Sequence, residues 1–398
     1  MKKYTPISFE INLRPEGCVF DVGSLFEALL ALHDQRDARG IRYALVTVLV
    51  HVVLAKLAGE DSLRGIAQWV AERQEGLAEL LGLAKPQAPC YTTYGRILGR
   101  AVAVDEFDHV VGGFFAGLPG AGRTVEIALD GKTLRGTIPL GQTRGVHLLA
   151  AYCPGEGLVF AQVAVESREN EIVAAPRVLK MLDLQGKIVT GDALLTQRKL
   201  AIQIVKAGGE YVFPVKENQP ELLADIRTLF EPEPCVKGFS PTTKDLRSAQ
   251  KVEKGHGRLE KRTLTASRDV NGYVDWPYAE QVFQLEREFK QLNTGQITQA
   301  VVYGITSLAV KEADAARLLT ITRGHWRIES GLHYRRDVTL REDRSRVRTG
   351  HAPQVLAVVN NLVLGLLARL GYTNAPAARR HFAAHLDEAV NLILQAQL

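Results

Sequence analysis

Apolar residues over the first 120 positions recur at the spacing of helices. The stretch from Ile41 to Leu57 is almost continuously apolar, which indicates a buried helix rather than a surface one. Ser62 precedes a further helical pattern and is a good N-cap residue. Proline and glycine then gather over Leu118–Gly122, and they predict a domain boundary. We therefore expect a helical N-terminal domain over residues 1–120.

From residue 121 the pattern changes to alternating apolar and polar positions, which is typical of strands. The predicted order is three strands, a helix, a strand, a helix and a strand. These segments are 124–130, 146–152, 158–165, 171–184, 187–192, 196–207 and 210–215. This is the order of a ribonuclease-H-like fold, in which an antiparallel meander precedes crossover units. In that fold the first and fourth strands lie side by side.

The remaining chain shows two different hydrophobic patterns. Residues 241–308 again alternate and predict a β-rich insertion or extension, whereas 309–398 is helical, including the arginine-rich stretch Glu312–Arg348. The predicted fold class is therefore α/β. A ribonuclease-H-like catalytic core begins at 121–240, the β-rich insertion follows, and the helical C-terminal region 309–398 completes the core.

Composition narrows the class of protein. The 398 residues are 46% hydrophobic and 23% charged, which fits a globular protein of more than one structural unit. A net charge of +5 suits a polyanionic partner. Four cysteines without CxxC pairs argue against a zinc ribbon and suit a reducing, cytoplasmic location. The apolar stretches Ala44–Ala55 and Val355–Leu370 are too short or too polar for membrane spans, so we expect no membrane partner.

Two acidic residues follow the predicted first and fourth strands. Asp130 ends the segment 124–130, and Asp192 ends the segment 187–192. If those strands are neighbours, the two carboxylates meet, and a hard cation such as Mg²⁺ would relieve their repulsion. The alternative is that both are ordinary turn residues at strand ends.

A third carboxylate can come from the arginine-rich stretch Arg323–Arg348, which holds eight arginines and four acids. Glu329 is the candidate, with Glu342 and Asp343 in reserve. The guanidinium group of arginine can donate two hydrogen bonds to one phosphate, and the aromatic rings between these arginines can stack on bases. A solvated charged face is the alternative. Trp326 is more commonly a core residue, although it could stack on a flipped base.

Several motifs in order resemble a known family. Ile127–Gly136, Val189–Gln197, Tyr211–Gln219 and the stretch from His325 to Arg346 are similar to segments of insertion-sequence transposases of the DDE superfamily, closest to the H-repeat-associated proteins. The resemblance covers nearly the whole chain. It implies metal-dependent DNA cleavage and strand transfer, with Asp130, Asp192 and Glu329 as catalytic ligands of two Mg²⁺ or Mn²⁺ ions. It also implies double-stranded DNA, both element ends and target, as partner, a transposase-associated N-terminal domain over residues 1–120 that contacts DNA, and a homodimer in the DNA complex.

The signature around the glutamate departs from the wider group, which carries Tyr, Arg, Glu and Lys where this chain has Thr322, His325, Glu329 and Arg336. Two alternatives stay open: a ribonuclease-H-like DNA nuclease without strand transfer, or a catalytically decayed relative that only binds DNA. No GxGxxG or P-loop motif supports a nucleotide-metabolising enzyme. The expected DNA contacts are Lys132, Arg135, Lys216, Asn218, Gln219, His325, Trp326, Arg327 and Arg336.

Overall fold

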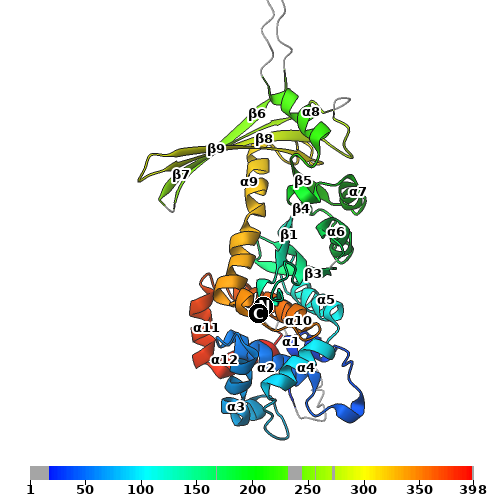
Figure 1. Cartoon of the computed structure of the whole chain (residues 1–398), viewed down its shortest axis with the longest axis vertical. Helices are drawn as coiled ribbons and strands as arrows, with labels where there is room; N and C mark the ends of the chain where they lie inside the picture. Colours follow the sequence, from blue (N-terminus) through cyan, green and yellow to red (C-terminus); the bar gives the residue numbers. More distant parts are fainter. Residues whose placement is uncertain (1–17, 167, 232–243, 256, 271–273, 397–398) are drawn as a thin grey trace, which may run out of the picture.

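The computed structural model describes residues 18–166, 168–231, 244–255, 257–270 and 274–396. The expected start at residue 1, and the expected boundary between 240 and 241, lie outside these ranges. Figure 1 shows a long molecule, with a cluster of helices at one end and a curved sheet that runs from the middle to the other end.

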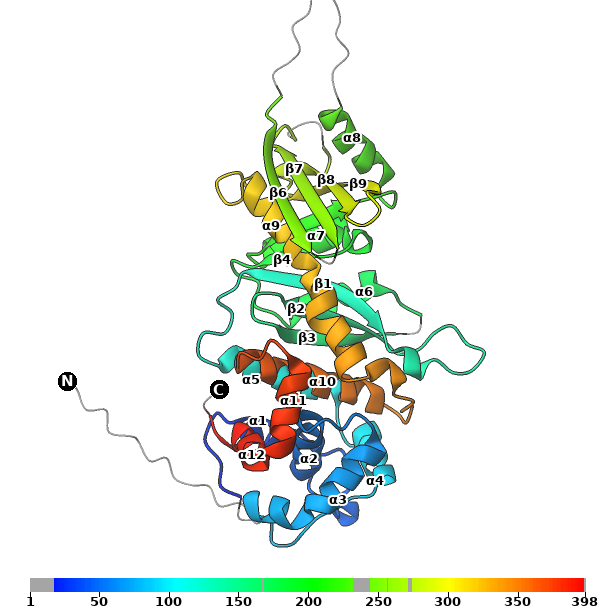
Figure 2. The same cartoon turned by 90° about the vertical axis from the view of Figure 1, so that its left-hand side faces the viewer.

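The helical cluster combines the two ends of the described chain. Its members share one apolar core and lie together in both views (Figures 1 and 2). They are α1 (Leu25–Leu30), α2 (Leu45–Leu57), α3 (Leu63–Leu80), α4 (Tyr91–Arg100), α5 (Val104–Gly117), α10 (Ala352–Arg369), α11 (Ala375–Ala384) and α12 (Leu386–Leu394).

Two apolar helices occupy the centre of this cluster. Every residue of α2 is buried, as its continuous apolar run predicts. By length and composition α10 could cross a membrane, but most of it is enclosed within the protein. Both apolar stretches that the sequence offers are therefore buried helices in this structure.

The described residues form one nine-stranded sheet in the order β3-β2-β1-β4-β5-β9-β8-β7-β6. The strands β1, β2 and β3 pair antiparallel, and β4 and β5 continue the sheet in parallel with β1. The predicted contact between the first and fourth strands is confirmed. The bounds are β1 (Glu126–Thr133), β2 (His147–Cys153), β3 (Leu158–Val165), β4 (Ile188–Thr190) and β5 (Glu210–Val215).

The β-rich segment extends this same sheet. Its last strand, β9, pairs antiparallel with β5 and carries β8, β7 and β6 outward in turn. The outer strands project beyond the rest of the molecule (Figure 1). Their bounds are β6 (Arg247–Gly255), β7 (Arg258–Ser267), β8 (Gln281–Gln291) and β9 (Ile297–Thr306), and α8 (Pro220–Phe230) lies between β5 and β6 in sequence.

The alternation of β1 separates two layers. Ile127 and Leu129 face a core that includes residues of α6 (Glu171–Lys180) and α7 (Arg198–Lys206). Ala128 faces the other side, in the core of the helical cluster. Because side chains alternate along a strand, Asp130 shares the face of Ala128.

The stretch Glu312–Arg348, expected to be helical, forms a helical run over residues 315–339 and leaves the helical conformation before Arg348. The run begins as α9 (Ala315–His325) and contains π-helical turns at η4 (Glu329–His333) and η5 (Arg335–Thr339). Arg341 has a φ of 50°, in the left-handed region, so the run does not continue through it. The expectation of helix agrees with the structure over residues 315–339, whereas arginine content gives no signal for a π-helical turn. Such turns often accompany functional sites.

Candidate active site

The register of β1 against β4 brings the two predicted aspartates together. Ala128 pairs with Thr190, so continuing the parallel register by two residues places Asp130 beside Asp192. Asp130 lies within β1, opposite Ala150 of β2, so the prediction that it ends its strand was wrong. It lies just beyond the last β4 pair, where the sheet opens between β1 and β4.

Glu329 reaches the same place from the π-helical turn. Ligand atoms of Asp130, Glu329 and His333 all lie within 4.8 Å of one another. The His333 Nδ1 atom lies 3.5 Å from Asp130 Oδ2 and 3.8 Å from Glu329 Oε2. Burial, followed by the charges of Arg336 and Lys132, lowers the pKa of His333 to about 3, so the imidazole is neutral at pH 7.

A fourth carboxylate, absent from the sequence prediction, comes from the first turn of α6 and lies on the face of β1 opposite to Asp130. Glu171 Oε1 lies 2.8 Å from His147 Nε2, and His147 Nδ1 lies 2.8 Å from Thr133 Oγ1. A Cβ on Gly131 would collide with this carboxylate, so the glycine after Asp130 makes the room it occupies. The sequence contains one signal for this arrangement, which is the glycine that follows Asp130. Only the fold shows that this glycine leaves room for Glu171.

The pKa values of Asp130 and Asp192 are both raised, and each of these carboxyls is influenced by neighbouring acids. Burial, then the charges of Glu329 and Glu171, raise the pKa of Asp130 to about 7, and Asp192 adds to the effect. Burial also raises the pKa of Asp192, whose Oδ1 accepts a hydrogen bond from the Leu195 amide at 3.0 Å.

A divalent cation fits this donor set. Among the described residues, neither lysine nor arginine forms an ion pair with Asp130, Asp192 or Glu329; the neutral His333 is the neighbour of two of them. Clustered carboxylate oxygens without a protein cation are the ligands that Mg²⁺ and Mn²⁺ prefer.

Three predicted DNA contacts are buried and engaged inside the protein, which corrects those predictions. The Lys132 Nζ atom lies 2.6 Å from Asp337 and 3.7 Å from Asp343. His325 is 9% exposed, its Nδ1 lies 3.0 Å from Thr190 Oγ1, and burial lowers its pKa to about 4.

The third is Arg336, which is fully buried. Its Nε donates to Glu342 Oε2 at 2.8 Å, and its Nη1 donates to Gln162 and Asn361. The local sequence shows only an arginine-rich helix, whereas these acceptors come from distant segments. Glu342 is thus held in an ion pair with Arg336, and Asp343 forms ion pairs with Lys132 and Arg135. Neither of these two reserve acids is therefore available as the third carboxylate of the site.

The other predicted contacts divide into two kinds. The amides of Asn218 and Gln219 donate to the Ala193 and Thr196 carbonyls at 2.6 and 3.0 Å, so they brace the loop that follows Asp192. The remaining four side chains are exposed, and for Trp326, at 58% exposure, this rules out a core position. They are Arg135, Lys216, Trp326 and Arg327.

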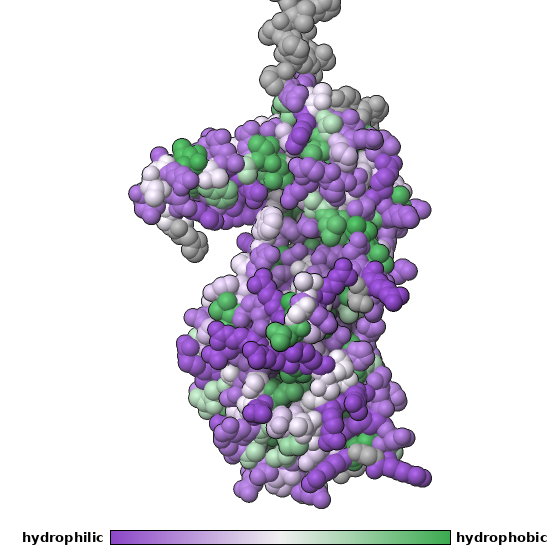
Figure 3. Space-filling view, in the orientation of Figure 1, coloured by the Kyte–Doolittle hydropathy of each residue, from purple (hydrophilic) through white to green (hydrophobic). Residues whose placement is uncertain are grey.

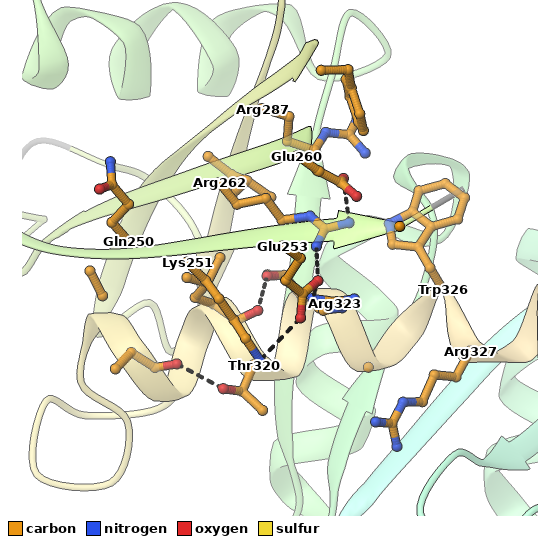
Figure 4. Close-up of a pocket in the computed structure, with 18 of the residues that line it drawn as sticks. Gln250, Lys251, Glu253, Glu260, Arg262, Arg287, Thr320, Arg323, Trp326 and Arg327 are labelled. Carbon is orange, nitrogen blue, oxygen red and sulfur yellow. Dashed lines mark hydrogen bonds and ion pairs between the residues drawn. The ribbon is translucent and has the colours of Figure 1, made fainter. Parts of the chain in front are cut away.

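A groove of about 1150 Å³ runs between the outer strands and α9 and reaches Trp326, Arg327 and Ser330. Figure 4 shows Arg262, Arg287 and Arg323 directed into it, with Trp326 and Arg327 at one end. Glu253 and Glu260 pair with part of this charge. In the surface view the outer strands overhang a hollow with a mainly hydrophilic rim (Figure 3).

A smaller pocket of about 150 Å³ opens beside Asp192. Its wall is mostly apolar, with Val212, Phe283 and Val302 among the lining residues. Trp326 lines this pocket as well as the larger groove, so the two cavities adjoin at an exposed aromatic ring.

Comparison with known proteins identifies the class of protein. The Transposase DDE domain family matches residues 121–366, and the DDE_Tnp_1-associated family matches residues 26–115. The chain therefore belongs to the DDE transposases, a family of DNA-processing enzymes that use divalent metal ions, and the family resemblance in the sequence is confirmed.

Named relatives extend over most of the chain. "Putative transposase YncI" of Escherichia coli O157:H7 is 29% identical over 87% of this chain and 87% of its own length. "H repeat-associated putative transposase YhhI" of Escherichia coli K12 is 25% identical over 92% of this chain and 96% of its own length. A piggyBac transposase synaptic complex with hairpin DNA aligns with a TM-score of 0.42 and 10% identity, over 92% of this chain and 78% of that one.

Proposed function

We propose that the protein catalyses metal-dependent cleavage and strand transfer of DNA during transposition of an insertion sequence. The observation that carries the proposal is the closeness of the Asp130 and Glu329 carboxylates, whose oxygens lie within 4.8 Å of each other, next to the end of β4 that Asp192 follows. The order of β1 to β5 supports a ribonuclease-H-like core around them.

Asp130, Asp192 and Glu329 would hold Mg²⁺ or Mn²⁺, two ions as the resemblance implies, and the charge of Glu171 across the sheet would add to the attraction for cations. Such ions supply charge neutralisation to the attacking and leaving oxygens of phosphoryl transfer. Asp192 is oriented for this by the Leu195 amide. The buried Lys132–Asp337 pair ties β1 to η5 and so keeps the Glu329 segment against the strand.

DNA would approach along the groove between the outer strands and α9. Arg327 and Lys216 are exposed near the acids and would contact phosphates, because a guanidinium or ammonium group neutralises them. The exposed Trp326 ring and the adjoining apolar pocket suit an unstacked base. Double-stranded DNA as substrate, a homodimer in the DNA complex and a cytoplasmic location complete the proposal.

The test uses a cut element end, supercoiled plasmid and Mg²⁺. We expect joined product from the wild-type protein, and none from Asp130→Ala, Asp192→Ala or Glu329→Ala, each with an unchanged circular dichroism spectrum. Joined product from one variant would remove that residue from the site. Cleavage of an uncut element end without joining of the cut one would identify a nuclease instead of a transposase.

A further inference from the structure

A second basic groove lies in the helical part of the molecule, away from the acidic site. It has a volume of about 730 Å³. One wall is formed by the start of α3 and the start of α4, and the other by the loop 341–349 that follows the π-helical turns. In Figure 2 this loop lies beside α4, so the groove joins segments from the two ends of the chain.

The lining of this groove carries positive charge that is not neutralised by ion pairs among the described residues. Five exposed lining arginines lack an ion-pair partner among the described residues, while the lining acid Asp61 is paired with the buried Arg379 at 2.6 Å. Glu60 is the one other lining acid. The five arginines are Arg64, Arg96, Arg341, Arg344 and Arg346.

Two helix N-termini add to this field. Both α3 and α4 begin at the groove, where helix dipoles are positive. Ser62 caps α3 through its side chain, whereas Cys90 makes no side-chain cap on α4. The Thr93 and Tyr94 amides of α4 donate to the Cys90 carbonyl, so the contribution of α4 is its dipole.

The arginine loop is fixed in place rather than free. Gly99 of α4 has no room for a Cβ because the Thr349 carbonyl lies against it, and the His351 amide donates to the Gly99 carbonyl at 3.1 Å. Arg348 donates to three carbonyls of residues 136–138. Because the backbone of this loop is already fixed, binding a ligand to its arginines would cost little conformational entropy.

The residue types that line this groove favour double-stranded over single-stranded DNA. Sites for single strands stack bases on exposed aromatic rings. Here the aromatic ring among the described lining residues is Tyr91, and the Arg64 guanidinium lies over it, 5.0 Å from the ring centre. Several guanidinium groups around a single ring that one of them contacts fit a sugar-phosphate backbone better than a row of stacked bases.

We propose that this arginine groove binds the backbone of duplex DNA, as a contact separate from the acidic site. The proposal deepens the proposed function, since it rests on DNA being the partner. Because the buried Arg336–Glu342 pair links the loop to η5, a duplex held there has a fixed position relative to Glu329. The groove would then set where along an element end the cut falls.

The experiment measures DNA binding without catalysis. A fluorescein-labelled duplex of the element end is titrated in EDTA at several salt concentrations, with Arg344→Ala/Arg346→Ala as the test variant. We expect affinity at about 100 mM salt to fall roughly tenfold or more, and the salt slope to fall by about two. The matched control is Lys199→Ala/Lys206→Ala, which removes the same charge from exposed positions of α7 and should bind like wild type.

Other outcomes decide against the groove. Equal losses in the two double variants would mean that only net charge matters, and tighter binding of single-stranded DNA would overturn the duplex assignment. Should the loop variant fail to fold, Arg64→Ala on the opposite wall is the substitute, with an expected slope change of about one. A wild-type protein that binds no DNA would refute the proposed function too, whereas wild-type binding by the groove variants refutes the groove alone.

Discussion

Substitution of Gly131 by alanine tests the fourth carboxylate most directly. The added Cβ would overlap the Glu171 carboxylate and lie 2.8 Å from His147 Nε2. Gly131 does not adopt a positive φ, so the effect is steric. Glu171 must move, and the His147–Glu171 contact of 2.8 Å is lost.

The magnitude follows from the groups involved. A charge-assisted hydrogen bond contributes about 1.5–3 kcal/mol, and partial exposure of both partners places this one at the lower end. Alanine in a strand returns about 0.5–1 kcal/mol relative to glycine. The net loss in free energy of unfolding is therefore about 1 kcal/mol, with a fall in Tm of roughly 1 °C for a chain of 398 residues.

The assay for function is Mn²⁺ affinity, measured by calorimetry and electron paramagnetic resonance. Moving the Glu171 charge away from the ligands should weaken binding by roughly 10-fold. Gly255→Ala, at a strand glycine with no neighbour near its Cβ, is the matched control. Wild-type Mn²⁺ affinity and Tm in Gly131→Ala would refute an influence of Glu171 on the site.

Three further predictions concern other parts of the molecule. Glu329→Gln should abolish the rise in Tm that Mn²⁺ produces in the wild-type protein; a persisting rise would remove Glu329 from the metal site. Arg336→Met should lower stability by about 3–5 kcal/mol by leaving Glu342 buried and unpaired, and adding Glu342→Gln should recover part of it in urea unfolding, whereas no recovery would contradict the pairing. Burial raises the pKa of Asp108 to about 7. The folded state therefore keeps a proton that the unfolded state loses, and stability falls from about pH 4 to pH 7. Asp108→Asn should flatten this slope in melts across that range, and an unchanged slope would assign it to other groups.

The sequence came close to the core of the site because its signals there are local. Alternation and strand order predicted that the first and fourth strands pair, and Asp130 and Asp192 follow from that pairing. Glu329 came from family resemblance, since a charged helix looks the same whether or not it carries a ligand. The apolar runs at Ile41 and Val355 likewise identified buried helices correctly.

Tertiary structure alone decided which charged side chains are available to a substrate. Lys132 and Arg336 look like DNA contacts in the sequence, but their partners Asp337 and Gln162 lie 205 and 174 positions away. Glu171 and the loop 341–349 acquire their roles only when distant segments meet. Hydrophobic periodicity records which face of an element is buried, and so it determined the order of elements and the first two acids. It carries no information about which opposite charge folds against a given side chain, because that choice depends on long-range packing.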